Sequence, residues 1–459
     1  MPSNISQIIK DLYQFNRTLL GEGCDNSIEY LKKLLDLRII EIPSGTKLET
    51  WEVPQEWIVK DAWVKFNGEK IIDCKKEPLS LLVYSQPFNG KVSLEELKKH
   101  LYWVDDMPDA IPYNYSFYEP NWGFGVAKNK FFDKVQLCTD CNDSLKGLDP
   151  SIGKVRIEGI NDKPLWKDKM AEGEYEVFID TEFRNGTLKI AEHTIKGKSD
   201  KEILLFAHLD HPYQANDNLS VVACLVDLAF KIKDKFSHTI KIIFCPETIG
   251  SIAYALTQDI SKVDFMVALD AIGNNETLLV QKPFSENKLD WVAHLALLKT
   301  GVSFRKGNFM QLIGSDEYVF NDPKIGIPGI MISRFPYKEY HTSADTLEIV
   351  LEEKIADVQT YIENLISIWE RNYVPVRNFK AQLMRSKYGF QSPSKEFNRL
   401  LDYLVYLTDG KKDLVEICVL SGVGFDYAYE MFEKLKENNL IKSADNRAHT
   451  RKRGQQKTA

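Results

Sequence analysis

The chain has 459 residues, of which 44% are hydrophobic and 27% charged. It is therefore long enough for two or three domains and has the composition of a globular protein. The net charge of -7 at pH 7 argues against a protein that acts mainly by binding nucleic acid. No apolar run approaches the ~18 residues of a membrane span, and the N-terminal residues lack the core of a signal peptide. Seven scattered cysteines indicate reduced thiols, so we expect a cytoplasmic protein without membrane attachment.

The N-terminal part of the chain begins with helical patterns. Apolar residues at helical spacing predict helices over 8–19 and 27–37, and a strand-like segment follows at 47–53. From 61 to 184 the pattern changes to short aromatic and β-branched runs separated by Gly, Pro and Asn, with one helix predicted over 94–103. Because no long linker flanks this part, residues 61–184 are predicted to be a β-rich domain inserted into the first domain.

In the next part of the chain, strands alternate with helices. The predicted strands are 202–207, 240–245, 265–269 and 329–333, and the predicted helices are 221–233, 251–259, 288–300 and 352–373. Alternation of this kind predicts an α/β fold with a mixed, mainly parallel sheet flanked by helices. Residues 1–60 and 185–375 are predicted to form this domain together.

The C-terminal part is predicted to be a separate helical domain, residues 380–447. Its three amphipathic helices are predicted at 397–407, 413–421 and 425–438. Gly422 and Gly424 lie in the turn before the last helix, which indicates a helix-turn-helix shape. Residues 448–459 form a basic tail that is predicted to be disordered.

The charge of the third predicted helix bears on its partner. It carries lysines, but also Asp426, Glu430, Glu433 and Glu437. Acidic side chains on a recognition helix repel phosphates. A role in binding a protein partner or in homo-oligomer formation is therefore favoured over binding to nucleic acid.

Polar residues gather where the predicted strands end. The apolar run 203–207 ends in His208, Asp210 and His211, and a short loop then leads to Asp217 before a helix. The carboxyl ends of strands in an open α/β sheet are where ligands bind. Imidazoles and carboxylates crowded at such an edge are costly to desolvate unless a cation or hydrogen bonds compensate. Zinc accepts both kinds of ligand.

Later strand ends add further candidates. Glu247 follows the strand 240–245, Asp270 ends the strand 265–269, and His341 follows the last strand. Glu247 is the candidate general base for a metal-bound water. Asp210 is expected to accept the second ring N–H of His208 and to fix its tautomer. A single His or Asp at a strand end is more often structural, but the whole set favours a metal site.

Several motifs occur in a fixed order along the chain. They are His208-Leu-Asp210, Asn216-Asp217-Asn218-Leu-Ser, Glu247, Leu269-Asp270-Ala-Ile-Gly273, Ser315-Asp316 and Tyr340-His341-Thr-Ser-Ala-Asp345-Thr. This order resembles the zinc exopeptidase superfamily, which includes bacterial leucyl aminopeptidases and glutamate carboxypeptidase-like proteins. Within it the chain looks most like bacterial aminopeptidase-like domain proteins. That resemblance implies an inserted β-rich domain, a C-terminal winged helix and a link with polysaccharide biosynthesis.

The resemblance also implies metal ligands. His208, Asp217 and Asp270 would bind one zinc, Asp217 would bridge to a second zinc held by His341, and Glu247 would be the proton shuttle. The family usually has a second acidic residue after the general base, but this chain has Thr248, whose hydroxyl brings no charge. Glu317 or His211 is a possible replacement, but the alternative is favoured: one tightly held zinc, with the second weakly bound or absent.

Two functions from different classes follow from these features. The first is a zinc-dependent hydrolase of amide bonds that acts on a peptide, an acylated amino sugar or a polysaccharide precursor. The second is a catalytically degenerate binding or scaffold protein that docks partners, or DNA, through its winged helix. Cys138 and Cys141 form a single CxxC without a second pair, so ordinary thiols are favoured there over structural zinc.

Overall fold

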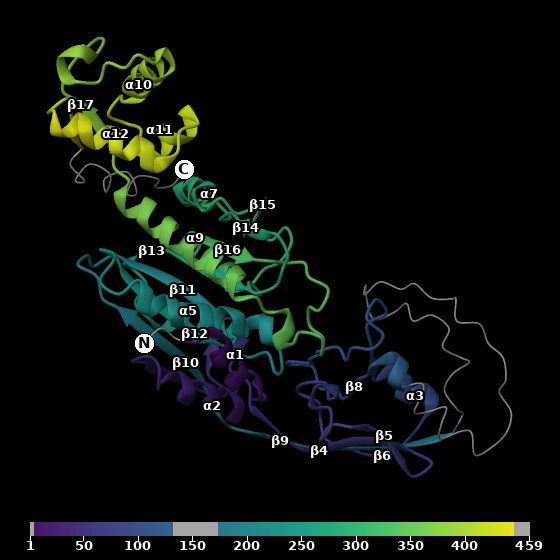
Figure 1. Ribbon diagram of the computed structural model, residues 1–459. Coiled ribbons are helices and arrows are strands. Elements are labelled where there is room, and N and C mark those ends of the chain that lie inside the picture. The colour runs from purple at the N-terminus through teal and green to yellow at the C-terminus, as the bar shows by residue number, and fades with distance from the viewer. Residues whose placement is uncertain (1–3, 132–172, 445–459) are drawn as a thin grey trace, which may run out of the picture.

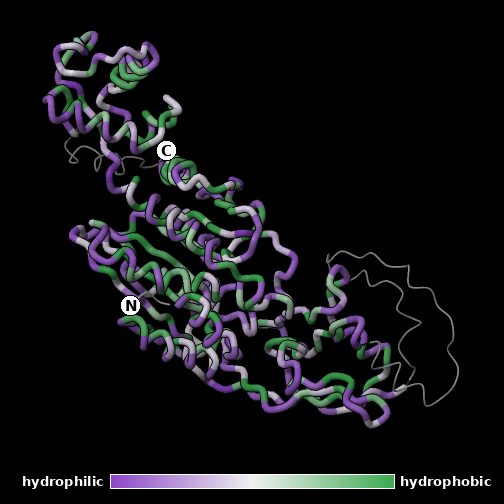
Figure 2. Tube along the Cα trace, in the orientation of Figure 1, coloured by the Kyte–Doolittle hydropathy of each residue, from purple (hydrophilic) through white to green (hydrophobic). Residues whose placement is uncertain are grey.

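The structure is a computed structural model that describes residues 4–131 and 173–444. It has an α/β body in the middle, a β-rich part at one end and a small helical part at the other (Figure 1). Figure 2 shows hydrophobic stretches along the central strands and helices of the body, where the main core lies. The basic tail and the Cys138–Cys141 pair lie outside the described residues. The other five cysteines are buried and free.

The body is built on a mixed sheet of eight strands, counted within the described residues. In spatial order they are β1 (Arg38–Pro43), β10 (Thr187–Ile195), β12 (Thr239–Cys245), β11 (Glu202–His208), β13 (Val263–Asp270), β16 (Gly329–Ser333), β14 (Leu278–Gln281) and β15 (Phe304–Gly307). The four central strands, β12, β11, β13 and β16, are parallel. β1 and β10 at one side are antiparallel, as is β14 against β16. The predicted mixed, mainly parallel α/β fold is confirmed.

Helices cover both faces of this sheet because the central strands are apolar on both sides. Leu204 and Phe206 of β11 belong to the core on one face, and Leu205 and Ala207 to the core on the other. The first face is covered by α6 (Ile249–Thr257) and α8 (Glu317–Phe320). The helices of the second face are α1 (Ile5–Tyr13), α5 (Ser220–Lys231), α7 (Lys288–Thr300) and α9 (Glu352–Arg371). α2 (Glu22–Leu31) contributes buried residues to the core on this second face. None of the described helices is long and apolar enough to cross a membrane.

The β-rich part is an antiparallel sheet reached by two long strands. β4 (Glu56–Phe66) and β9 (Glu174–Arg184) pair along nearly their whole length and lead out of the body (Figure 1). β5 (Glu69–Asp73) and β6 (Phe88–Ser93) complete the order β5-β4-β9-β6.

Short elements complete this part. They are the hairpin of β2 (Lys47–Leu48) and β3 (Trp51–Glu52), helix α3 (Leu94–Lys99), and the parallel pair of β7 (Leu101–Tyr102) and β8 (Phe124–Gly125). The helix predicted over 94–103 is thus shorter, since its last residues pair as β7.

One segment of the β-rich part returns to the body. The backbone N–H of Tyr113 donates to the carbonyl of His341 over 2.7 Å, and the N–H of Ser343 donates to the carbonyl of Ile111 over 2.7 Å. The Ser343 hydroxyl accepts the N–H of Ile111 as well. The segment around Tyr113 is therefore attached to the loop that carries His341.

The C-terminal part consists of three helices and a two-stranded sheet. The helices are α10 (Lys395–Leu407), α11 (Leu414–Ser421) and α12 (Phe425–Glu437), and β17 (Pro375–Arg377) pairs antiparallel with β18 (Ile441–Ser443). Asp426 of α12 forms ion pairs with Lys299 of α7, at 2.9 Å, and with Arg371 of α9, at 2.6 Å. The assignment of this part as a winged helix stays a prediction.

Candidate metal centre

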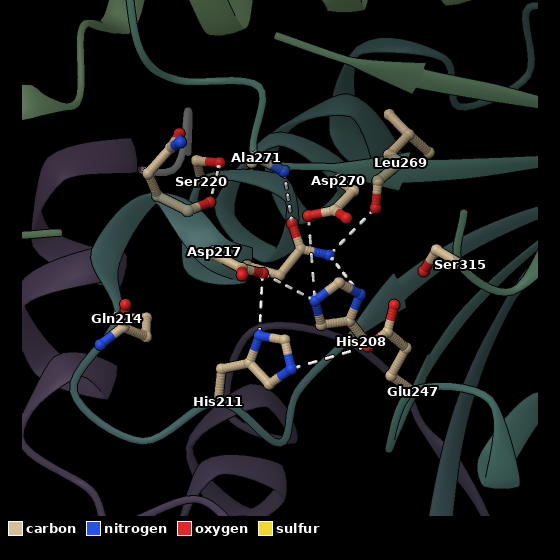
Figure 3. A network of polar contacts seen from close by, with 12 residues as sticks. His208, His211, Gln214, Asp217, Ser220, Glu247, Leu269, Asp270, Ala271 and Ser315 are labelled. Carbon is tan, nitrogen blue, oxygen red and sulfur yellow. Dashed lines mark hydrogen bonds and ion pairs between the residues drawn. The ribbon is translucent and has the colours of Figure 1, made fainter. Parts of the chain in front are cut away.

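Three predicted ligands meet at the carboxyl ends of the central strands. His208 ends β11, Asp270 ends β13, and Asp217 lies in an irregular turn, Ala215–Leu219, directly before α5. His208 Nε2 is 2.9 Å from Asp217 Oδ1 and 4.0 Å from Asp270 Oδ1 (Figure 3). All three side chains are buried. The parallel arrangement of β11 and β13 thus places these groups together, as expected for strands that end at one edge.

The turn that carries Asp217 is fixed by its polar neighbours. The side chains of Asn216, Asn218 and Ser220 accept the backbone N–H groups of Gly273, Ala271 and Ile272, at 2.7, 3.2 and 3.3 Å respectively. The segment 216–220 is thereby attached to the chain that follows Asp270. This explains the buried polar motif around Asp217, because each of its side chains satisfies a buried backbone donor.

The loop after the last strand supports the same turn. Asp345 accepts the backbone N–H groups of Ala215, Asn216 and Asp217, at 3.1, 2.6 and 3.1 Å. The hydroxyl of Tyr337 donates to the same carboxylate over 2.8 Å. The motif from Tyr340 to Asp345 therefore reaches the turn with Asp345, while its histidine reaches the Asp217 side chain.

Asp217 is contacted by three imidazole rings. Besides His208, His341 Nε2 lies 3.1 Å from Asp217 Oδ2, and His211 Nδ1 lies 2.9 Å from Asp217 Oδ1. These two contacts do not have the angles of a hydrogen bond, so His211 Nδ1, His341 Nε2 and Asp217 Oδ2 are buried without a hydrogen-bond partner. The structure thus brings His211 into the centre beside the four predicted ligands.

Glu247 lies at the open side of the cluster. Its side chain is 24% exposed, whereas those of His208 and Asp217 are at most 1% exposed. Glu247 Oε2 is 3.6 Å from His211 Nε2, so the carboxylate faces the ring that also touches Asp217. This position, between the buried groups and solvent, suits a base that acts on a bound water.

Asp210 has a different partner from the predicted one. Its Oδ1 accepts the backbone N–H of Glu247 over 2.8 Å. His208 Nδ1 instead lies 3.0 Å from Asn218 Nδ2, and the Asn218 amide is oriented by the carbonyl of Leu269. Asp210 therefore fixes the strand end that carries Glu247, because that N–H has no partner within the sheet.

Thr248 and Glu317 do not contact the cluster of side chains around Asp217. The Thr248 N–H donates to Asp316 Oδ1 over 3.0 Å, and Glu317 Oε2 accepts the N–H of Ser315 over 3.0 Å. Two sets of closely spaced ligand atoms occur in the described part of the chain: His208, His211 and Asp217, and His208, Glu247 and Asp270. Of the two candidate replacements for the missing acid, His211 joins the centre and Glu317 does not.

The buried carboxylates and imidazoles of the cluster are groups that a cation would stabilise. Burial and the negative charge of Asp217 raise the pKa of Asp270 well above its ordinary value. Burial opposes the charged form of His208, but Glu247, Asp217 and Asp270 outweigh it and raise the His208 pKa well above its ordinary value. Neutral imidazoles, carboxylates and the partnerless oxygens Asp217 Oδ2 and Asp270 Oδ1 match the ligands that zinc accepts.

Two contributors were not assigned to the site from the sequence. The guanidinium of Arg17, which is buried, donates to the carbonyls of His211 and Gln214. The ring of Tyr113 packs against His211 and His341, with centroid distances of 5.3 and 5.1 Å. The strand-like spacing of the aromatic residues around Tyr113 favoured core packing over a substrate-facing surface, and no pattern in the sequence pointed to Arg17.

The described geometry can be compared with known proteins. Residues 6–372 match the family described as "Domain of unknown function (DUF4910)". The chain belongs to this family. It is also 30% identical, over 92% of both chains, to a protein of Clostridium acetobutylicum named "Putative polysaccharide biosynthesis protein with aminopeptidase-like domain".

Solved structures agree with the fold. A crystal structure of a "putative peptidase" from Clostridium acetobutylicum is 29% identical, with a TM-score of 0.77 over 96% of both chains. A zinc aminopeptidase from Bacillus subtilis is 14% identical, with a TM-score of 0.55 over 79% of this chain and 93% of the other. A peptidase of Shewanella amazonensis is 14% identical, with a TM-score of 0.53 over 79% and 91%. The fold is that of the aminopeptidase-like peptidases, as the motif order implied.

Proposed function

We propose that this protein is a zinc-dependent hydrolase of amide bonds. The observation that carries the proposal is the meeting of His208, Asp217 and Asp270, with two partnerless carboxylate oxygens, beside the partly exposed Glu247. Buried groups of this kind are stable when a divalent cation binds them. The similarity to proteins named as peptidases supports the same reaction class.

The residues have distinct roles in this proposal. His208, Asp217 and Asp270 would hold the zinc ion, which would supply an acidified water and polarisation of a carbonyl group. Glu247 accepts a proton from the water and delivers it to the leaving nitrogen. The elements of water are added across the C–N bond, so that a carboxylate and an amine leave. Asp210 holds the backbone N–H of Glu247 and so positions the base.

The remaining parts of the chain would determine the substrate and the partners. We propose that residues 61–184 are an inserted domain that shapes the cleft, since Tyr113 packs against His211 and His341. The substrate is a peptide or another small amide, and the polysaccharide link rests on the name of the clostridial relative. The C-terminal winged helix is proposed to bind a protein partner or a second copy of the chain. A cytoplasmic location stays a prediction.

The test is a screen of amide hydrolysis with zinc added to the metal-depleted protein. The wild-type protein should hydrolyse at least one class of peptide or acylated amine, and Glu247→Gln should lose activity by about 10²–10⁴-fold while it keeps its zinc. Glu286→Gln, at an exposed position, is the matched control. A Glu247→Gln protein that retains full activity would refute the proposal. A protein that binds no metal would instead favour the scaffold function.

A further inference from the structure

One tyrosine of the β-rich part lies beside the candidate metal centre. The ring of Tyr113 is nearly perpendicular to the ring of His341, with centroids 5.1 Å apart, and its centroid lies 5.3 Å from that of His211. Both histidines contact Asp217, His341 at 3.1 Å and His211 at 2.9 Å. The β-rich part therefore places a side chain against the residues of the centre, although most of it extends away from the body.

The backbone around Tyr113 is fixed on both sides. Its own N–H donates to the carbonyl of His341 over 2.7 Å. On the other side, the N–H of Ser116 donates to the carbonyl of Val83, and the N–H of Val83 donates to the carbonyl of Asn114, each over 3.0 Å. The segment is thus held between the loop that carries His341 and the rest of the β-rich part. A group held in this way is in position before a substrate arrives, which is what makes a hydrogen-bond donor effective in catalysis.

The hydroxyl of Tyr113 is a donor without an acceptor in the described part of the chain. The side chain is only 3% exposed, and no hydrogen bond joins its hydroxyl to another described residue. Its oxygen is nevertheless not among the buried oxygens that lack a partner, so it retains contact with solvent. A tyrosine hydroxyl is protonated at neutral pH and can donate one hydrogen bond. This donor is therefore available to a bound molecule.

Other donors close to the centre already have acceptors within the chain. The hydroxyl of Tyr337 donates to Asp345 over 2.8 Å, and the guanidinium of Arg17 donates to the carbonyls of His211 and Gln214. These groups support the backbone of the centre and are not free for a substrate. Tyr113 differs from them because its ring is fixed while its hydroxyl is unused.

We propose that Tyr113 is a catalytic residue, supplied to the centre by the β-rich part. Its hydroxyl donates a hydrogen bond to the carbonyl oxygen of the substrate amide. This inference rests on the proposed function, in which water adds to that carbonyl group. Negative charge develops on the oxygen as the water adds, so a fixed donor stabilises the transition state more than it stabilises the bound substrate.

The first experiment compares Tyr113→Phe with wild type on a substrate found by the screen, both equilibrated with zinc. We expect kcat to fall by about 10²–10³-fold with little change in KM, because the hydroxyl acts mainly in the transition state. Zinc content and thermal unfolding should not change, since the ring that packs against His211 and His341 is kept. Tyr403→Phe, at an exposed position of α10, is the matched control.

The second experiment does not depend on hydrolysis. It measures the binding of n-butylboronic acid to the same zinc-equilibrated proteins by calorimetry. In its tetrahedral form this compound has an oxygen that can take the place of the negative carbonyl oxygen. Because a hydrogen bond to a charged group is a strong one, Tyr113→Phe should bind it about 10–100-fold more weakly than wild type. Tyr403→Phe should bind it as wild type does.

The outcomes separate this inference from the proposed function. If amides are hydrolysed and Tyr113→Phe keeps the kcat of wild type or its affinity for the boronic acid, the role of Tyr113 is refuted and the hydrolase proposal stands. A fall in kcat together with loss of zinc also refutes it, because Tyr113 would then only position His341. If no amide is hydrolysed but boronic acid binding requires the hydroxyl, the donor is supported while the hydrolase proposal fails. A wild type that neither hydrolyses amides nor binds the boronic acid refutes both.

Discussion

Asp345 accepts the backbone N–H of Asp217 over 3.1 Å, and through this contact the last motif of the chain supports the candidate ligand of the second motif. The same carboxylate accepts two further N–H groups of that turn. Asp345 is completely buried and belongs to neither of the two sets of closely spaced ligand atoms found in the described residues. Its role is therefore to hold in place the backbone segment that carries Asp217.

Replacing Asp345 should weaken zinc binding indirectly. Asp345→Ala leaves the buried N–H groups of Asn216 and Asp217 without their acceptor, so we expect the free energy of unfolding to fall by about 1–3 kcal/mol. We expect zinc affinity to fall by about 10–100-fold, as for other residues that orient ligands. Zinc titration and thermal unfolding measure both effects, with the exposed Asp200→Ala as control. Unchanged zinc affinity in a folded Asp345→Ala protein would contradict this role.

Arg17 should be needed for both stability and the position of His211. Its guanidinium donates to the carbonyls of Leu12, His211 and Gln214. Arg17→Met should lower the free energy of unfolding by about 2–4 kcal/mol because these buried acceptors lose their donor. Arg17→Lys should not restore this stability, since an ammonium group lacks the planar set of donors of a guanidinium. If Arg17→Lys keeps wild-type stability, the guanidinium is not required.

Tyr115 is expected to contact the substrate. Its side chain is 50% exposed, and its ring centroid lies 5.7 Å from that of Tyr113, which packs against His211 and His341. On a substrate found by the screen, Tyr115→Ala should raise KM several-fold with little change in kcat, because the ring contributes to binding and not to proton transfer. Tyr115→Phe separates the ring from the hydroxyl. A fall in kcat alone would argue against this role.

His238 should make stability depend on pH without involving the metal centre. Its ring contacts Glu370 at 2.9 Å and Asp264 at 3.2 Å. Burial lowers the pKa of His238, but Asp264 and Glu370 outweigh this effect and raise it to about 9, from 6.5. Since the folded pKa lies above the unfolded one, the stabilisation is complete below pH 6.5 and is lost as the pH rises through 9.

The matching variant is His238→Gln. At pH 6 it should reduce the free energy of unfolding by about 1–3 kcal/mol, and at pH 10 the difference from wild type should be much smaller. Denaturant unfolding at both pH values measures this, with His193→Gln as the surface control. An equal loss at both pH values would mean that His238 contributes through packing and not through its charge.

The sequence was informative where strands are long and buried. His208 and Asp270 end strands whose apolar runs are continuous, so their meeting at one edge followed from the parallel topology. The sheet edges were not predicted: β14 is only the four residues Leu278–Gln281, and β1 lies at Arg38–Pro43, before the strand-like segment predicted at 47–53. Runs this short do not differ clearly from loops in their pattern.

Contacts that depend on loop geometry could not be predicted. Asp210 was expected to bind the His208 ring, but which neighbour a carboxylate reaches depends on how the loop turns, and here it binds the Glu247 N–H. Arg17 donates to backbone carbonyls far along the chain, such as that of His211. Every residue has a backbone carbonyl, so the residue types do not reveal this contact. His211 was one of two candidates for the missing acid, and only its position beside Asp217 distinguished it from Glu317.

The central claim is that a divalent ion holds side chains from distant parts of the chain at the sheet edge. Crystals grown with zinc and measured at the zinc absorption edge test it most directly. We predict an anomalous peak bounded by His208 Nε2, Asp217 and Asp270 Oδ1. Zinc-equilibrated crystals with no anomalous density beside His208, Asp217 and Asp270 would contradict the account.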